Sequence, residues 1–426
     1  MKSRTLISVA AVLMLGATAG CGGGGGSPEA DTAAKAHGPI NIWYSNNAAE
    51  VAWAKQMIAA WNSAHPSETV SAQEIPAGKT SEEVIGASIT AGNAPCLIYN
   101  TSPAAVPNFQ AQGGLVPLDD FADGASYITT RSGGTAEQYK SPDGKFYQLP
   151  WKSNPVMLFY NKKIFAKAGI STTAPPLGTY TDFLATSKKL VSSGAAKYAI
   201  FPSPSSEFYQ SWFDFYPMYA AETGLQLVVD QKATFDSDGG RAVAGVWQQL
   251  YAQNLAGKEA YTGDSFADGI AAMSSAGPWA IAAYKGKVDW GVVSVPTQAG
   301  SAADQSTFSD AKNVAIYTAC VNRGTAWDFL KFTTSKEQDG KLLEMTGQMP
   351  MRQNLEQEYT AYFTANPKYK VFAAKSAHVV EVPNVKGSVE VWQVFRDQWS
   401  NSVIFGKEDP NKALADAATK INDLVK

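Results

Sequence analysis

The sequence has few residues of the types that bind metals or act as nucleophiles. It has three histidines and three cysteines in 426 residues, and no two histidines lie near one another in the chain. It has no H-E-x-x-H or C-x-x-C pattern, no phosphate-binding G-x-x-x-x-G-K-S/T loop and no G-x-S-x-G nucleophile elbow. Asp119 and Asp120 are neighbours on a turn, whereas a glycosidase needs two opposed carboxylates across a cleft. Nothing in the sequence therefore points to an enzyme.

Charge is scarce as well. Only 17% of the residues are charged, and the net charge is −3. The chain has neither the basic excess of a nucleic-acid-binding protein nor a basic helix that would lie on lipid. Aromatic residues are abundant by comparison, at 11%. We expect no nucleic-acid partner, no cofactor and no bound metal.

The N-terminus has the features of an export signal. In residues 1–21, a positively charged start precedes an apolar stretch from Thr5 to Ala19, which is too short for a membrane span. Cys21 follows small residues, as in the lipobox of bacterial lipoproteins, although Thr18 stands where an apolar residue is usual. The Gly-rich residues 22–37 are typical of a flexible tether. We expect lipidation at Cys21 and a position on the outer face of the cytoplasmic membrane, held by the lipid anchor only; the alternative is an ordinary secretion signal.

Two further cysteines lie in the body of the chain. Cys96 and Cys320 are both in apolar, strand-like runs. Export permits a disulfide, but sequence does not set the distance between them. They form either one disulfide or two buried thiols.

Hydrophobic periodicity beyond residue 38 predicts an α/β fold. Strands alternate with helices in a βαβαβ order, which is typical of a mainly parallel, doubly wound sheet. Such sheets bind ligands at the carboxyl ends of their strands, here 44–47 and 100–102. Both stretches are polar and uncharged, and they also suit ordinary turns. The predicted elements are strands 40–44, 70–75 and 96–100, and helices 51–61, 82–91 and 106–112.

Several stretches, taken in order, resemble one family. They are GGLVPLDDF (113–121), GKFYQLPWKSNPVMLFYNKKIFAKAGI (144–170), AMSSAGPWAI (272–281) and VPNVKGSVEVWQVFRDQWSNSVIFG (382–406). In these features the chain resembles the extracellular solute-binding proteins of ABC sugar transporters, in the clade of maltose-binding protein. The resemblance covers nearly the whole mature chain. It implies two doubly wound α/β lobes joined by hinge strands, with a ligand cleft between them.

The resemblance also implies a division of the chain and a mode of action. We expect lobe 1 to comprise 38–150 and about 285–323, lobe 2 to comprise 151–284 and about 324–408, and a C-terminal helix, 409–426, to pack on lobe 1. The protein is expected to be a monomer that captures its ligand by hinge closure. It would then deliver the ligand to the transmembrane subunits of an ABC permease.

Ligand-binding residues follow from the resemblance one at a time. Trp279 matches a tryptophan that stacks on the ligand, because an indole covers the C–H face of a sugar ring; the alternative is a core tryptophan at a helix start. Trp392 matches a second stacking tryptophan. Arg352 matches a loop that places an arginine in the cleft in some family members; the alternative is a surface or interlobe ion pair. The remaining candidates are Tyr44, Asn47, Asn100, Trp151, Asn154, Trp212, Phe213, Asp214 and Asp310.

The expected ligand is a sugar, preferably a di- or oligosaccharide, since the aromatic residues suit several rings. Asn47 and Asn154 stand where maltose-binding relatives have acidic residues, so maltose itself is not implied. A monosaccharide, polyol, glycerophosphodiester or polyamine is an alternative ligand, as is a peptide or a metal. An anchored carbohydrate-active enzyme is a further alternative.

Overall fold

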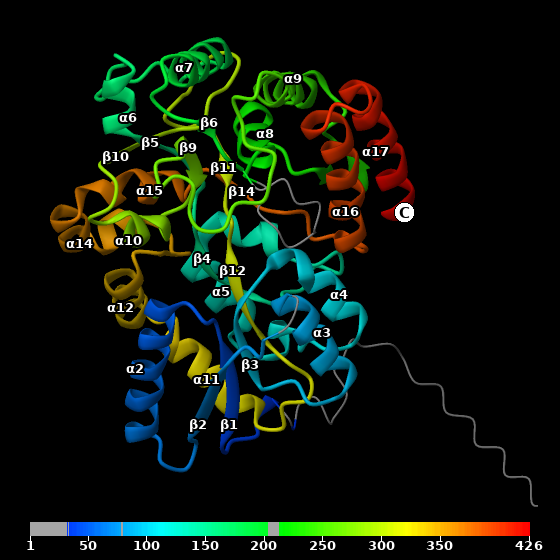
Figure 1. The fold of residues 1–426 in the computed structure, drawn as a ribbon. Coiled ribbons are helices and arrows are strands. Elements are labelled where there is room, and N and C mark those ends of the chain that lie inside the picture. Colours follow the sequence, from blue (N-terminus) through cyan, green and yellow to red (C-terminus); the bar gives the residue numbers. More distant parts are fainter. Residues whose placement is uncertain (1–31, 33, 78–79, 203–212) are drawn as a thin grey trace, which may run out of the picture.

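The computed structural model describes residue 32 and residues 34–77, 80–202 and 213–426. These residues form two α/β lobes stacked one on the other, with the N-terminal strands in lobe 1 and the C-terminus in lobe 2 (Figure 1). Each lobe has its own sheet and hydrophobic core, as expected for a chain of this length. No helix among these residues is long and apolar enough to cross a membrane.

Lobe 1 is built on a six-stranded sheet in the order β13-β4-β12-β3-β1-β2. The predicted βαβαβ opening is confirmed, since β1 pairs in parallel with both β2 and β3. Strand β12 returns antiparallel between β3 and β4. The strands are β1 (Ile40–Tyr44), β2 (Val70–Glu74), β3 (Leu97–Thr101), β4 (Leu149–Ser153), β12 (Lys312–Ile316) and β13 (Met349–Pro350).

The helices of lobe 1 pack their apolar residues on this sheet. Trp53 and Trp61 of α2 enter a core that also holds Leu97 of β3 and Trp327 of α11. The helices are α2 (Ala48–Ala64), α3 (Ser81–Thr90), α4 (Val106–Ala111), α5 (Gly124–Ser132), α11 (Arg323–Thr333) and α12 (Lys336–Thr346), with short turns η1 (Pro103–Ala105) and η3 (Gly133–Tyr139).

Lobe 2 is built on a four-stranded sheet in the order β10-β5-β9-β6, in which only β6 and β9 are parallel. Its strands are β5 (Met157–Asn161), β6 (Tyr198–Ile200), β9 (Ala271–Ala276) and β10 (Trp290–Val293), with a hairpin of β7 (Val228–Val229) and β8 (Lys232–Ala233). Its helices are α6 (Lys162–Lys167), α7 (Tyr180–Ser192), α8 (Tyr216–Thr223), α9 (Asp238–Ala252), α10 (Ala280–Tyr284), α13 (Leu355–Glu358), α14 (Thr360–Ala365), α15 (Lys370–Lys375), α16 (Ser388–Trp399) and α17 (Pro410–Leu424).

The structure corrects the predicted division in three places. Helix α17 packs on α16 and α9 of lobe 2, not on lobe 1, because Leu414 and Ile421 face the lobe-2 core (Figure 1). Helices α11 and α12 belong to lobe 1, since Leu330 and Leu342 lie in its core. Strand β10 pairs with β5 and so belongs to lobe 2.

Hinge segments cross side by side between the lobes. The chain between β4 and β5 is hydrogen-bonded to the segment that follows β11 (Thr307–Phe308), since Asn154 N donates to Ser309 O at 2.8 Å. Strand β11 is parallel to β14 (Val379–Val380), and Ser309 N donates to Val380 O at 3.1 Å. Three segments far apart in the sequence therefore form one layer on which the lobes can rotate.

Cys96 and Cys320 form a disulfide in lobe 1, which resolves the alternative left open by the sequence. The bond joins β3 to β12 at the end of these strands that lies away from lobe 2.

Candidate functional site

Charged and polar side chains gather where the strands of lobe 1 end toward lobe 2. Helix α2 begins after β1 and places Glu50 there, and α3 begins after β2 and places Glu82 there. Strand β4 ends at Lys152 and Ser153, beside the start of β12 at Lys312. We call this region, which comprises Glu50, Glu82, Asn100, Lys152, Asp310 and Lys312, the lobe-1 edge. It is the place where open α/β sheets bind ligands.

The inner part of the lobe-1 edge is a buried ion pair. Lys152 Nζ donates to Glu50 Oε1 at 2.5 Å, and Gln348 Nε2 donates to the same oxygen at 2.7 Å. Ser45 Oγ donates to Glu50 Oε2 at 2.6 Å. Burial opposes ionisation, but Lys152 and these hydrogen bonds outweigh it and lower the pKa of Glu50. This pair links α2 to β4, and the hydrogen bonds from Ser45 and Gln348 connect it to the end of β1 and the start of β13.

The outer part of the edge is partly exposed. Lys312 Nζ donates to Asp310 Oδ1 at 3.0 Å, and both side chains retain solvent access. Asp310 has a φ of 41°, the left-handed conformation that turns the chain from the hinge into β12. Burial raises the pKa of Glu82, and Lys312 opposes that rise. Burial disfavours the ammonium of Lys312, but Asp310 and Glu82 outweigh it and raise its pKa.

Lobe 2 contributes an aromatic pocket. Trp279 is half-buried just before α10, and its ring lies 5.8 Å from that of Phe213. Phe213 in turn lies 6.2 Å from Phe308 at the end of β11. This chain of rings leads from the pocket to Asp310, two residues beyond Phe308. The pocket has a volume of about 300 Å³ and is also lined by Phe201, Ser274, Ser275 and Tyr284.

Two predicted ligand residues are core residues of lobe 2 instead. Trp392 is 0% exposed and packs edge-on against Tyr216 at 5.2 Å. Asp214 is also 0% exposed. Both of its carboxylate oxygens accept hydrogen bonds from Arg396 Nη1 at 2.8 Å. Neither side chain is accessible from the surface in this structure.

Three predicted ligand residues of lobe 1 lie in its core or cap a helix in this structure. Trp151 is 1% exposed and packs 5.2 Å from Trp53. Tyr44 is buried in the same core. Asn47 is exposed, and its Oδ1 caps α2 by accepting from two backbone amides.

Asn154 and Asn100 are at the hinge side of lobe 1. Asn154 is buried, and its Nδ2 donates to Gln348 Oε1 at 3.4 Å, so it supports the Glu50 network from behind. Asn100 has a φ of 67° at the end of β3 and keeps partial exposure. Trp212 lies outside the described residues, as does Cys21.

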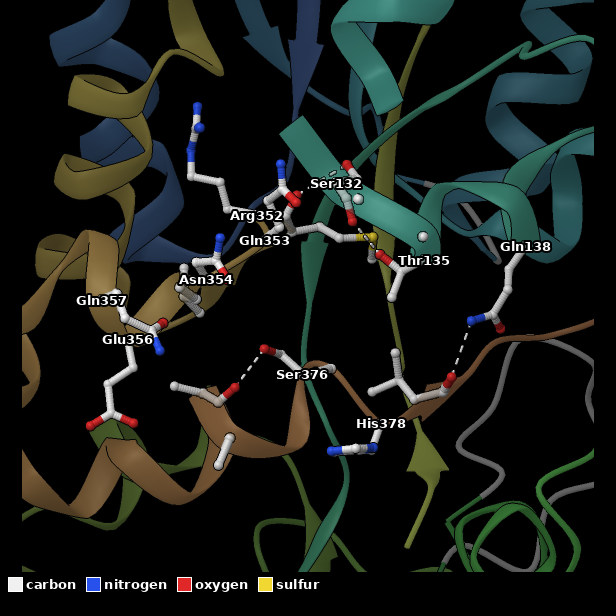
Figure 2. A pocket seen from close by; sticks show the side chains of 18 of the residues that line it. Ser132, Thr135, Gln138, Arg352, Gln353, Asn354, Glu356, Gln357, Ser376 and His378 are labelled. Carbon is white, nitrogen blue, oxygen red and sulfur yellow. Dashed lines mark hydrogen bonds between the residues drawn. The ribbon is translucent and has the colours of Figure 1, made fainter. Parts of the chain in front are cut away.

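Arg352 forms an ion pair with Asp339 of α12, within lobe 1 and not between the lobes. Its Nε donates to Asp339 Oδ2 at 2.9 Å. It adjoins a polar cavity of about 630 Å³ between lobe 1 and the segment from Ser376 to Val379. Figure 2 shows the Arg352 side chain directed away from the cavity, toward α12. Arg352 is not among the residues that line the aromatic pocket.

Sequence reasoning predicted Asn100 and Asp310 of the lobe-1 edge but missed its residues Glu50, Glu82, Lys152 and Lys312. Glu50 and Glu82 are first-turn residues of helices that follow strands, where a carboxylate also suits the helix dipole. Lys152 and Lys312 carried no sequence signal, because only the pairing of β4 with β12 brings them together.

Glu381 is a buried carboxyl group where the hinge segments meet. Its Oε2 accepts from Tyr139 Oη of lobe 1 at 3.2 Å and from Ala311 N at 3.1 Å. Its backbone oxygen accepts from Tyr216 Oη of lobe 2 at 2.7 Å. Burial raises the pKa of Glu381 to about 7, with Asp310 adding to the rise and Lys312 opposing it.

This environment predicts a pH-dependent stability. The folded protein holds the Glu381 proton more tightly than the unfolded chain, whose glutamate pKa is about 4.3. The free energy of unfolding should therefore fall by about 3 kcal/mol as pH rises from about 4.5 to 7, and no further above that. In Glu381→Gln this component should be missing, as measured by urea unfolding across the range. Glu344→Gln, an exposed control, should keep the wild-type profile; a Glu381→Gln profile parallel to wild type would contradict the assignment.

The geometry thus defines a class of two-lobed α/β proteins. Their lobes meet at a layered hinge, with a polar edge on one lobe and an aromatic pocket on the other. The family described as bacterial extracellular solute-binding protein matches residues 56–371. The chain belongs to this family. Among the residues described, no group of three or more His, Cys, Asp or Glu is placed to hold a metal.

Named relatives agree with this assignment. A putative binding protein of Brucella abortus (strain 2308) is 25% identical over 334 residues, which cover 75% of this chain and 77% of the relative. The sn-glycerol-3-phosphate-binding periplasmic protein UgpB of Rhizobium meliloti (strain 1021) is 24% identical over 73% of this chain and 76% of its own. The crystal structure of the cyclic alpha-maltosyl-1,6-maltose binding protein from Arthrobacter globiformis superposes with a TM-score of 0.76 at 18% identity, over 92% of this chain and 99% of that one.

Proposed function

We propose that this protein captures a sugar between its two lobes and delivers it to the permease of an ABC importer. The observation that carries the proposal is the pairing of an aromatic pocket on lobe 2 with a hydrogen-bonding edge on lobe 1 across one hinge. A sugar has an apolar C–H face and a rim of hydroxyl groups. The Trp279 and Phe213 rings suit the face, and the Asp310, Glu82 and Lys312 side chains suit the rim.

The proposed mechanism is closure about the hinge. A ligand that contacts both lobes only when they are closed binds that state more tightly and shifts the population toward it. A micromolar ligand supplies about 8 kcal/mol, part of which is used to drive closure. The permease then distinguishes the loaded, closed form. No catalytic step is needed in this cycle.

Location follows the same proposal. We propose that the lipidated Cys21 anchors the protein at the outer face of the cytoplasmic membrane. We also propose that the protein acts as a monomer. The Cys96–Cys320 disulfide supports export, because such bonds persist in oxidising compartments. The di- or oligosaccharide preference is part of the proposal, and the name of the Arthrobacter globiformis relative supports it.

Removing the Trp279 ring tests the proposal directly. The soluble body would first be screened by thermal shift against mono-, di- and oligosaccharides, polyols and polyamines. A ligand at about a hundred times its Kd adds about 2.7 kcal/mol of stability. For the sugar that binds, Trp279→Ala should weaken affinity by about 10- to 100-fold in calorimetry, since stacking and burial of an indole contribute about 1.5–3 kcal/mol.

The matched control is Phe405→Ala, which removes an exposed aromatic ring outside the pocket. Its sugar affinity should equal that of the wild type. A response to polyamines with none to any sugar would refute the sugar proposal. Sugar binding that Trp279→Ala leaves unchanged would place the ligand elsewhere.

A further inference from the structure

The lobe-1 edge contains cations, but each has a carboxylate partner. Lys152 is paired with Glu50 at 2.5 Å and is almost completely buried. Lys312 is paired with Asp310 at 3.0 Å, and Glu82 lies close enough for the two groups to influence each other's ionisation. The edge as a whole holds three acidic groups against two basic ones.

The arginines of the flanking segments are engaged as well. Arg352 is bound to Asp339 at 2.9 Å. Arg396 is bound to Asp214 at 2.8 Å inside the lobe-2 core. Among the residues that line the aromatic pocket within the described chain, none is a lysine or arginine, and Asp264 is acidic.

The pairing of these cations with carboxylates limits which ligands the lobe-1 edge accepts. A phosphate group loses its hydration on entering a protein site and needs an unpaired cation or several converging N–H donors in return. At the lobe-1 edge, a phosphate approaching Lys312 also approaches the carboxylates of Asp310 and Glu82. Repulsion between the phosphate and these neighbouring carboxylates costs several kcal/mol in a partly desolvated site. An uncharged hydroxyl group meets no such penalty. Carboxylates accept a hydrogen bond from its O–H, and the ammonium donates a hydrogen bond to its oxygen.

Building on the proposed function, we propose that Asp310 and Glu82 are specificity-determining residues that neutralise Lys312, so that the site accepts uncharged polyhydroxyl ligands and rejects phosphorylated ones. The ligand class thereby differs from that named for the UgpB relative of Rhizobium meliloti, which binds sn-glycerol 3-phosphate. Lys312 is retained as a hydrogen-bond donor to sugar hydroxyls rather than as an anion receptor.

The test uses the mature chain and sn-glycerol 3-phosphate as the anionic probe. Calorimetry at low salt should detect no binding to the wild type. The double variant Glu82→Gln/Asp310→Asn leaves Lys312 without its nearest carboxylates, so its affinity for sn-glycerol 3-phosphate should rise at least about tenfold, with a strong salt dependence. Adding Lys312→Met to this double variant should abolish the gain. The control Glu344→Gln/Asp416→Asn removes two exposed carboxylates elsewhere and should gain nothing.

The outcomes separate this inference from the proposed function. Wild-type binding of sn-glycerol 3-phosphate would overturn the inference, and a sugar response in the same protein would leave the proposed function standing. A double variant that is folded by circular dichroism but gains no anion affinity would also overturn the inference. If no sugar binds but the double variant gains Lys312-dependent anion affinity, the exclusion of phosphate by Asp310 and Glu82 stands, whereas the proposed function fails together with the uncharged ligand class that rests on it.

Discussion

Replacing Asp214 by alanine should lower the free energy of unfolding by about 3–5 kcal/mol. The Asp214 carboxylate accepts from Arg396 Nη1 at 2.8 Å with both oxygens, and from Trp399 Nε1 at 2.8 Å. It also accepts from the backbone amide of Phe215 at 2.8 Å. All of this takes place in a core from which water is excluded, since the side chains of Asp214 and Arg396 are 0% and 1% exposed. Removal of the carboxylate takes away the opposite charge that lies against the buried guanidinium. Chemical unfolding monitored by tryptophan fluorescence would measure the loss.

Two further variants make this prediction specific. Asp416→Ala breaks an exposed ion pair with Lys412 on α17 and should cost less than about 1 kcal/mol. The double replacement Asp214→Leu/Arg396→Met removes both charges and should recover part of the loss. A small effect of Asp214→Ala on stability, together with loss of sugar binding, would instead return Asp214 to the ligand site predicted from the sequence.

The Asp214–Arg396 ion pair shows which contacts the sequence alone does not contain. Asp214 stands beside Phe213, which does line the aromatic pocket, and the two side chains point in different directions. Its partner Arg396 lies 182 residues further along the chain. Only the packing of α16 against the segment before α8 brings the two charges together, and no local pattern encodes that contact.

Features that depend on near neighbours were predictable. The opening strands and helices agree with their hydrophobic periods, and Asp409 caps α17 as its position before Pro410 indicates. Trp279 lies half-exposed after a Gly-Pro pair, and it lines the pocket. The helical period of Trp392 is compatible with either face of α16, and in this structure Trp392 is buried and packs against Tyr216.

The lobe-1 edge depends on contacts of longer range. Lys152 and Glu50 are 102 residues apart, and Gln348 is 298 residues from Glu50. The residues meet because β1 and β4 end, and β13 begins, at the same side of one sheet. Hydrophobic periodicity located the strand ends, but the meeting of Lys152 and Lys312 depends on the register of β12.

Removal of the disulfide should lower stability by about 2–5 kcal/mol without a comparable loss of sugar affinity. Cys96 and Cys320 are separated by 224 residues, which include every strand of the lobe-2 sheet. The bond therefore closes a very long loop in the unfolded chain, and such loops gain most from a cross-link in the chain-entropy account. The position of the disulfide explains why sugar affinity should be retained. Cys96 precedes β3 and Cys320 follows β12, whereas Asn100 and Lys312, which belong to the proposed ligand site, lie at the opposite ends of these strands.

The double variant Cys96→Ala/Cys320→Ala separates these two effects. Guanidinium unfolding should show the loss of stability, while calorimetry with the sugar found by screening should show an affinity within about threefold of the wild type. Reductant should destabilise the wild type by a similar amount and leave the variant unchanged, which controls for the cavity made by the missing sulfur atoms. A large fall in sugar affinity would mean that the pairing of β3 with β12 is maintained by the disulfide along its whole length. An unchanged stability would mean that β-pairing and the lobe-1 core already hold these strands together, and that the cross-link adds little to them.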